Sequence, residues 1–209
     1  GNIYAGFLAR SMGVPIRRLI LATNENNVLE EFFTTGIYRP RSAEDTLATS
    51  SPSMDISKAS NLERFIWALL GPEVFMQRWA ELETTGTLDL RDQLPRLREE
   101  FGFVAGTSSH ADRLETIRSV KKRSGSLIDP HTADGVTVAL RVMEPGFPTL
   151  VMETAKAAKF PQTVAEALGS EPETPDVVAD LLARPQKVET IDNEEAPLRT
   201  LIEERALSR

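Results

Sequence analysis

The sequence predicts an α/β fold, in which part of a largely parallel sheet is flanked by helices. The first observation is the run Leu19-Ile20-Leu21-Ala22, whose unbroken apolar character is typical of a parallel strand covered on both faces. The second is that helical patterns precede and follow this run. The third is a further strand-to-helix unit that starts with a strand at Phe101–Ala105.

The N-terminal helix is expected to run to about Met12, because Gly13 can end a helix and Pro15 cannot continue it. After the predicted strand, the polar residues 23–26 offer caps for a second helix, which should end at Gly36. Residues 37–58 are polar and contain Pro and Ser. An irregular loop is therefore expected there, and a loop of this length is usually functional or mobile.

Two capping boxes predict further helices: Ser60 with Glu63 begins a helix that ends at Gly71-Pro72, and Ser109 with Asp112 begins another. The remaining expected elements are helical stretches around Val74–Thr84 and Leu90–Glu100, a third strand at Thr149–Met152, a late strand at Lys187–Ile191, and helices around Thr163–Leu168, Pro175–Ala183 and Pro197–Ala206.

Composition excludes several classes of protein. The 209 residues include 24 Lys and Arg against 31 Asp and Glu, which excludes a polycationic nucleic-acid binder. Ten acidic and three basic residues lie within 171–204, so the whole net charge of −7 belongs to this C-terminal stretch. The absence of cysteine excludes disulfide frameworks, thiolate zinc sites and cysteine nucleophiles. No apolar run approaches the roughly 20 residues of a membrane span.

The first residues contain neither an initiator Met nor a targeting signal. We therefore expect upstream chain to be missing and the protein to be cytoplasmic. A metal site is not expected, because the two histidines, His110 and His131, lack the spacing and the cysteines of a zinc centre.

The loops after Ala22, Ala105 and Thr154 are favoured for ligand binding, because ligands bind open parallel sheets at the carboxyl ends of the strands. Three motifs are further candidates. Gly1-Asn2 opens a helix and could direct free N–H groups at a phosphate; the alternative is an ordinary capped helix. Residues 50–55 gather hydroxyls and a carboxylate that suit a phosphate or an amino acid; the alternative is a turn that caps the next helix. Asp129-Pro130-His131-Thr132 begins a helix with polar side chains, and its alternative is a solvated capping turn.

Five motifs occur in order along the chain: Gly1-Asn2-Ile3-Tyr4-Ala5-Gly6, Ala22-Thr23-Asn24-Glu25-Asn26, Ser51-Pro52-Ser53-Met54-Asp55-Ile56, Asp129-Pro130-His131-Thr132-Ala133 and Ala158-Lys159-Phe160-Pro161. In this order and spacing they resemble the C-terminal half of threonine synthase, and especially its microbial and fungal branch. The resemblance implies that residues 1–209 are the C-terminal part of an incomplete large domain with the tryptophan-synthase-β type of fold. It also implies an all-helical insertion at Gly71–Glu100.

The resemblance implies a pyridoxal-phosphate enzyme that converts O-phospho-L-homoserine and water to L-threonine and phosphate. Gly1 and Asn2 match the end of the loop that holds the cofactor phosphate, and Thr132 matches the hydroxyl residue that contacts the pyridine nitrogen. The matching candidates for substrate contacts are Asn24, Ser51, Ser53, Asp55, Ser60, Asn61 and His131.

In threonine synthases the Schiff-base lysine lies in the N-terminal half, which is absent from this sequence. The six lysines here do not match its context and are expected to be solvated: Lys58, Lys121, Lys122, Lys156, Lys159 and Lys187. The fragment alone is therefore expected to be inactive and to need the missing half as its partner. Two other functions stay open: a sister phospho-amino-acid lyase or β-replacement enzyme on the same fold, and a noncatalytic α/β partner module.

Overall fold

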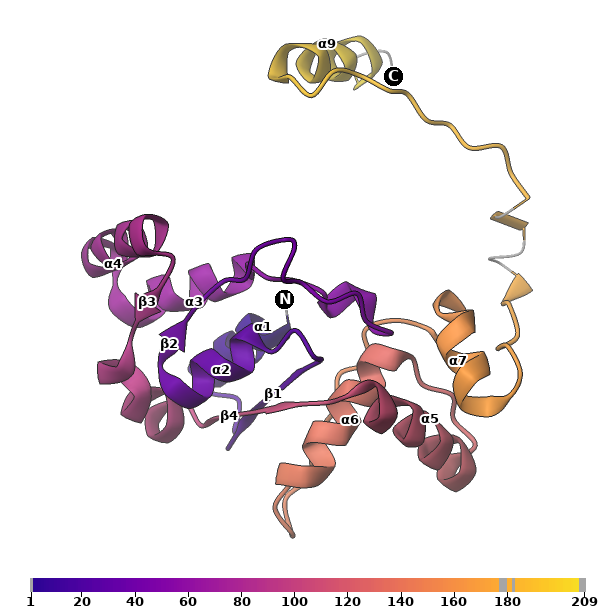
Figure 1. Cartoon of the computed structure of the whole chain (residues 1–209), viewed down its shortest axis with the longest axis horizontal. Coiled ribbons are helices and arrows are strands. Elements are labelled where there is room, and N and C mark those ends of the chain that lie inside the picture. The colour runs from indigo at the N-terminus through magenta and orange to yellow at the C-terminus, as the bar shows by residue number, and fades with distance from the viewer. Residues whose placement is uncertain (1, 177–179, 182, 207–209) are drawn as a thin grey trace. The chain divides into compact units, whose positions relative to one another are not determined.

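The computed structural model describes residues 2–176, 180–181 and 183–206, and it divides the chain into two compact units, Gly1–Glu173 and Thr174–Arg209 (Figure 1). The elements of the first unit are α1 (Asn2–Ser11), β1 (Leu19–Thr23), α2 (Val28–Thr35), β2 (Ile37–Tyr38), a 3-10 turn (Pro52–Met54), α3 (Ser60–Leu70), α4 (Pro72–Thr85), β3 (Leu88–Asp89), a 3-10 turn (Arg91–Gln93), a π-helical turn (Arg96–Glu100), β4 (Phe103–Thr107), α5 (His110–Ser124), α6 (Pro130–Val142), a 3-10 turn (Ala157–Lys159) and α7 (Pro161–Leu168).

The predicted parallel sheet is confirmed in its first two strands. β1 pairs with β4 in parallel, in a register that runs from Leu19 opposite Phe103 to Thr23 opposite Thr107. β4 begins two residues later than expected, after Gly102, whose φ of 67° is a left-handed conformation that favours glycine. α6 packs against both strands, and Gly106 of β4 lets it approach closely, since a Cβ there would lie 2.9 Å from Val138 Cγ1.

Aromatic side chains form the centre of the larger core. Phe65 of α3 lies with its ring centroid 5.0 Å from that of Phe7 and 5.2 Å from that of Phe103, both edge-on. Phe33 of α2 lies 4.4 Å from Phe103. These rings join α1, α2 and α3 to the sheet, and edge-to-face contacts add to the free energy gained by burying them. A smaller cluster, around Leu114, Ile117, Ala133 and Ala167, holds α5, α6 and α7 together.

The third strand predicted at Thr149–Met152 is wrong. This segment is not helical and joins no described strand, and its Leu150 and Met152 are 90% and 64% exposed. An apolar sequence forms a strand only where another strand can pair with its backbone, and the two-stranded sheet of the described residues does not extend to it. The late strand predicted at Lys187–Ile191 is also wrong, because these residues are exposed and irregular.

The predicted helices were mostly confirmed. The Ser109–Asp112 capping box is present, and Pro130 begins α6. The Ser60–Glu63 capping box is wrong, because the helix begins at Ser60 itself and its N-cap, Ala59, has no side chain that can accept a bond. The helix predicted over Pro175–Ala183 falls partly on residues 177–179 and 182, which lie outside the described residues.

The stretch Gly71–Glu100 is mostly helical, and it also contains β3, which pairs antiparallel with β2 (Ile37 opposite Asp89). This pair was not predicted. Gly36, with φ of 77°, turns the chain from α2 into β2, where a Cβ would lie 2.7 Å from Arg91 Cα. The close approach lets Leu90 N donate to Gly36 O at 2.7 Å, which ties the insertion to α2.

The second unit contains α9 (Glu195–Ala206) and the acidic stretch. Leu198 and Ile202 are exposed, and ion pairs such as Arg199 with Glu195 lie along the helix.

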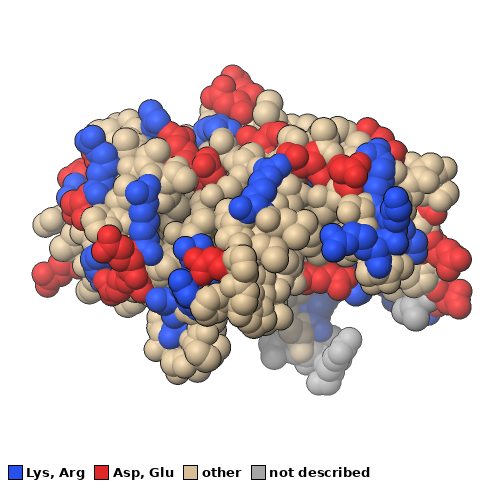
Figure 2. Space-filling view, turned by 90° about the horizontal axis from the view of Figure 1, so that it is seen from below, with Lys and Arg blue, Asp and Glu red and all other residues tan. Residues whose placement is uncertain are grey.

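Basic and acidic side chains are interspersed on the face drawn in Figure 2, without an extended basic area among the described residues visible there. Within the described part of the chain, no helix combines the length and apolar character needed to cross a bilayer.

Candidate functional site

The site lies where β1 and β4 end side by side. Thr23 and Thr107 are the last residues of these strands, and their hydroxyl oxygens lie 3.1 Å apart. The next residues, Asn24 and Ser108, are fully buried although they are polar. Buried polar groups need hydrogen-bond partners, so these two positions indicate where the surrounding loops must converge.

A hydrogen bond between Asn24 and Asp55 connects the loop of residues 46–55 to the end of β1. Asn24 Nδ2 donates to Asp55 Oδ1 at 2.8 Å and to Ser51 Oγ at 3.1 Å. Asn26 Nδ2 donates to the same Asp55 oxygen at 2.9 Å, and Thr49 donates to Asp55 through its N–H at 2.9 Å and its hydroxyl at 2.7 Å. Asp55 therefore organises this loop rather than capping α3.

The Asp129-Pro130-His131-Thr132 motif forms the start of α6, as predicted. Asp129 is the N-cap, and its Oδ1 accepts from the backbone N–H of His131 at 2.9 Å. The same oxygen lies 2.8 Å from His131 Nδ1, and Oδ2 accepts from the Thr132 hydroxyl. Burial acts to raise the pKa of Asp129, but the hydrogen bonds from His131 and Thr132 outweigh it, so the pKa is lowered. Asp129 is a buried carboxylate satisfied by its own helix.

His131 joins this helix start to the loop. The backbone N–H of Ser53 donates to His131 Nε2 at 3.0 Å, so Nε2 carries no proton and Nδ1 donates to Asp129. The ring packs against Phe160, with centroids 4.7 Å apart. A continuous chain of contacts thus runs from Asn24 through residues 51–53 and His131 to Thr132.

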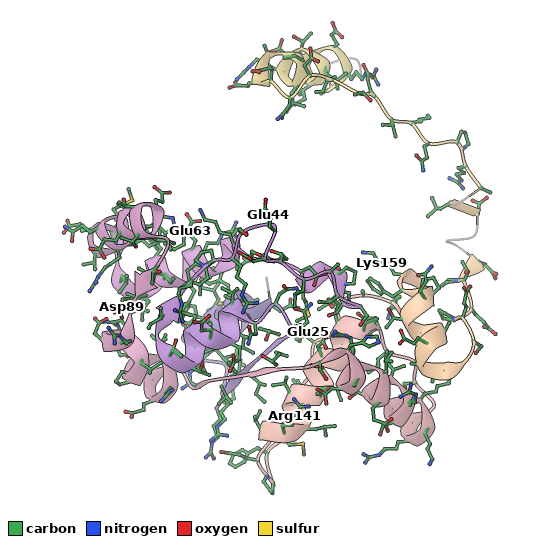
Figure 3. The ribbon with its side chains drawn as sticks, viewed as in Figure 1. Glu25, Glu44, Glu63, Asp89, Arg141 and Lys159 are labelled. Carbon is green, nitrogen blue, oxygen red and sulfur yellow. The ribbon has the colours of Figure 1, made fainter. Side chains whose placement is uncertain are left out.

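A second polar cluster lies around Arg113 of α5, which is fully buried. Its Nη2 donates to Glu25 Oε2 at 2.8 Å, its Nη1 to Asp134 Oδ1 at 3.2 Å and its Nε to Ser50 Oγ at 3.1 Å. Figure 3 shows Glu25 in the turn after β1, beside α6. On the outer side, Ser50 Oγ lies 2.7 Å from His110 Nδ1.

Asp134 is also fully buried, and its Oδ2 has no hydrogen-bond partner within the described part of the chain. Burial raises the pKa of Asp134 to about 6, although Arg113 and the nearby hydroxyls of Ser51 and Ser108 act in the opposite direction. Near neutral pH the buried Asp134 carboxyl is ionised, which costs free energy, and a fall of about one pH unit begins to protonate it.

The structure brings some of the predicted site residues together and leaves others apart. Asn24 and Ser51 are fully buried in the network, Thr132 is 5% and His131 7% exposed, and Ser53 and Asp55 lie in the same loop. Ser60 and Asn61 take no part: both lie in the first turn of α3, and no hydrogen bond joins them to the described network. Asn2 is exposed at the start of α1, and Gly1 lies outside the described residues.

The sequence prediction missed Arg113 and Asp134. A signal was present, since each stands four residues before a buried apolar residue, Ile117 and Val138, on the inner face of its helix. A charged residue at such a position needs a buried partner. All six lysines are exposed, as expected, and no group of three His, Asp or Glu in the described residues has the geometry of a metal site.

Comparisons with known proteins show which family the chain is similar to. Residues 132–202 match the family model described as "Threonine synthase, C-terminal". The threonine synthase of Methylobacillus glycogenes is 48% identical over 207 residues, which are 98% of this chain and 44% of that protein. The enzyme of Corynebacterium glutamicum is 50% identical over 201 residues, covering 93% and 41%.

Two solved structures share the fold. PLP-bound threonine synthase from Brucella melitensis superposes with a TM-score of 0.82 at 35% identity, over 97% of this chain and 43% of that one. The yeast enzyme gives 0.80 at 27% identity, over 99% and 45%. The chain spans less than half the length of these relatives. Over nearly its whole length, the chain is similar in sequence and fold to part of these threonine synthases, and its residues 132–202 match the C-terminal family model.

Proposed function

We propose that this chain works as the C-terminal part of a threonine synthase, which converts O-phospho-L-homoserine and water to L-threonine and phosphate with pyridoxal phosphate. The observation that carries the proposal is the connected set of buried polar groups, from Asn24 through Ser51 to Thr132, at the carboxyl ends of β1 and β4. This is where ligands bind in open parallel sheets. The identity to threonine synthases over the same residues supports it.

The donors present fit pyridoxal phosphate. The first turn of α1, which would face the cofactor phosphate, carries no acidic side chain, so Asn2 and the positive helix end suit an anion. At the other end, the Thr132 hydroxyl donates to Asp129 Oδ2 in this structure, and turning its proton away from Asp129 would let it donate to a pyridine nitrogen. When bound, the cofactor would supply an electron sink for negative charge that develops on the substrate carbons.

The side chains of the site have two roles: some orient the loops of the site, and others are free to bind substrate. Asn24 and Asp55 use their polar atoms within the loop, and His131 uses both ring nitrogens, so we assign these three to orienting the site. Ser53 is exposed and only its backbone N–H is engaged among the described contacts. Its hydroxyl can therefore donate to an anionic substrate, and phosphate oxygens are strong acceptors for such donors.

We assign the Schiff-base lysine, and the neighbouring strands, to a further part of the protein. Each lysine of this chain is exposed, whereas the proposed cofactor contact at Thr132 is buried. Residues 1–209, with 71–100 as their insertion, would then form part of a larger domain of a cytoplasmic enzyme.

The test is substrate turnover by the longer protein that contains this chain. Formation of threonine and phosphate in equal amounts from phosphohomoserine supports the proposal. Turnover of phosphoserine, phosphothreonine or serine alone would indicate a sister lyase or β-replacement enzyme. Tight association with a lysine-bearing partner and no turnover of any of these would indicate a noncatalytic module.

A further inference from the structure

Arg113 is a buried cation that joins three separate segments. It donates from Nε to Ser50 Oγ at 3.1 Å, from Nη2 to Glu25 Oε2 at 2.8 Å and from Nη1 to Asp134 Oδ1 at 3.2 Å. Its own side chain is 0% exposed. Only the planar guanidinium, with donors pointing in three directions, can make these bonds at once.

Each partner of Arg113 stands next to a candidate binding residue. Glu25 follows Asn24, and Ser50 precedes Ser51. Asp134 lies two residues after Thr132, in the first turns of α6. The three segments that carry the proposed substrate and cofactor contacts are therefore tied to a single side chain behind the site.

We infer that Arg113 is a positioning residue of the proposed threonine synthase site, which fixes loop 46–55 and the turn after β1 in the geometry that binds the phosphorylated substrate. This inference rests on the proposed function. Arg113 cannot touch a ligand itself, because it is fully buried, so its effect passes through Ser50 and Glu25.

The stability of the fold does not by itself require a buried cation such as Arg113. A buried cation loses its hydration, and apolar residues of similar volume often stabilise a core as well or better. Here the cation faces two carboxyls and a hydroxyl that belong to three different segments. A buried ionic group of this kind specifies one arrangement of those segments, which a substrate loop needs before it can bind tightly.

The experiment uses Arg113→Lys in the longer, active protein. Lysine keeps the charge, but its three N–H donors share one nitrogen, so it cannot reproduce the contacts that three separate guanidinium nitrogens make with Ser50, Glu25 and Asp134. We expect KM for phosphohomoserine to rise about tenfold with a much smaller change in kcat, as for the loss of a charge-assisted hydrogen bond that orients binding groups. Amide hydrogen exchange in residues 46–55 should become faster without substrate.

Arg118→Lys is the matched control. Arg118 lies on the same helix but is exposed, and its Nε donates to Ala167 O at 2.8 Å, away from the loop. Its kinetics and its loop exchange should match the unmodified protein. Ser50→Ala is the second variant, which removes the bond from Arg113 Nε and the contact with His110 Nδ1 and leaves both carboxyl contacts of Arg113 intact. It should raise KM in the same direction, and its effect should not add to that of Arg113→Lys.

The outcomes separate the two proposals. Unmodified protein that does not turn over phosphohomoserine contradicts the proposed function, and the exchange data then still test whether Arg113 holds the loop. Active protein in which Arg113→Lys changes neither KM nor exchange overturns the inference. If Arg113→Lys does not fold, Ser50→Ala decides: unchanged KM and exchange overturn the inference, and a raised KM with faster exchange supports it.

Discussion

Replacing Asp134 by Asn should change how stability depends on pH. Burial raises the pKa of this carboxyl to about 6, against an ordinary value of 3.8. Well below pH ~4 the group is protonated in both the folded and the unfolded protein. As pH rises further, the unfolded chain releases its proton first, so the folded state loses stability until the pH passes the folded pKa. The shift of about two units corresponds to about 3 kcal/mol.

The assay is reversible urea unfolding at intervals from pH 4 to pH 7.5. The free energy of unfolding of the unmodified protein, minus that of Asp134→Asn, should fall by about 2.5 kcal/mol over this range, mostly between pH 4 and 6, since the rest of the change lies below pH ~4. The control is Thr137→Ala, on the same helix, which removes a buried hydroxyl that lies 2.7 Å from Thr116 Oγ1 but no titratable group. Its difference should stay flat. A flat difference for Asp134→Asn would refute the reasoning.

Two further substitutions test the core and the helix start. Phe65→Ala should lower the free energy of unfolding by about 3–5 kcal/mol, because it empties the centre of the aromatic cluster; a loss below about 1 kcal/mol in denaturant titration would contradict that packing. Asp129→Asn should destabilise the protein by about 2 kcal/mol at pH 7, through weaker bonds to His131 and Thr132. Because the pKa of Asp129 is lowered, its stabilisation is present above pH ~4 and is lost as pH falls through the folded pKa, so the gap between the two proteins should close in acid; an equal gap at pH 3 would disprove this role.

Local patterns predicted the parts of the fold whose causes are local. The unbroken apolar run at 19–22 lies in strand β1, with Leu21 buried, and the Ser109–Asp112 and Asp129-Pro130 signals begin α5 and α6. The strand predicted at Thr149–Met152 failed because strand formation depends on a partner, and no described strand lies beside it. The β2–β3 pair was missed because two residues carry no periodicity, and its position depends on the close approach at Gly36.

In the candidate site, too, the residues that belong to short local motifs could be predicted from the sequence, and the contacts between distant segments could not. Asn24, the 51–55 loop and Asp129–Thr132 stand at strand ends and a helix start, where short motifs are visible in the sequence. The pairing of His131 with Ser53 spans 78 residues, and the bond from Arg113 to Glu25 spans 88, so neither could be derived without the fold. Ser60 and Asn61 matched by motif, yet they lie on α3 outside the network.

The most direct test of the central claim, that this chain supplies contacts to pyridoxal phosphate while the Schiff-base lysine lies elsewhere, is an intact mass after borohydride reduction with the cofactor. The 23.1 kDa chain alone should carry no specific pyridoxyl adduct, whereas the longer protein should carry one, on a lysine outside this sequence. A single stoichiometric adduct on any of the six lysines of this chain would contradict the claim.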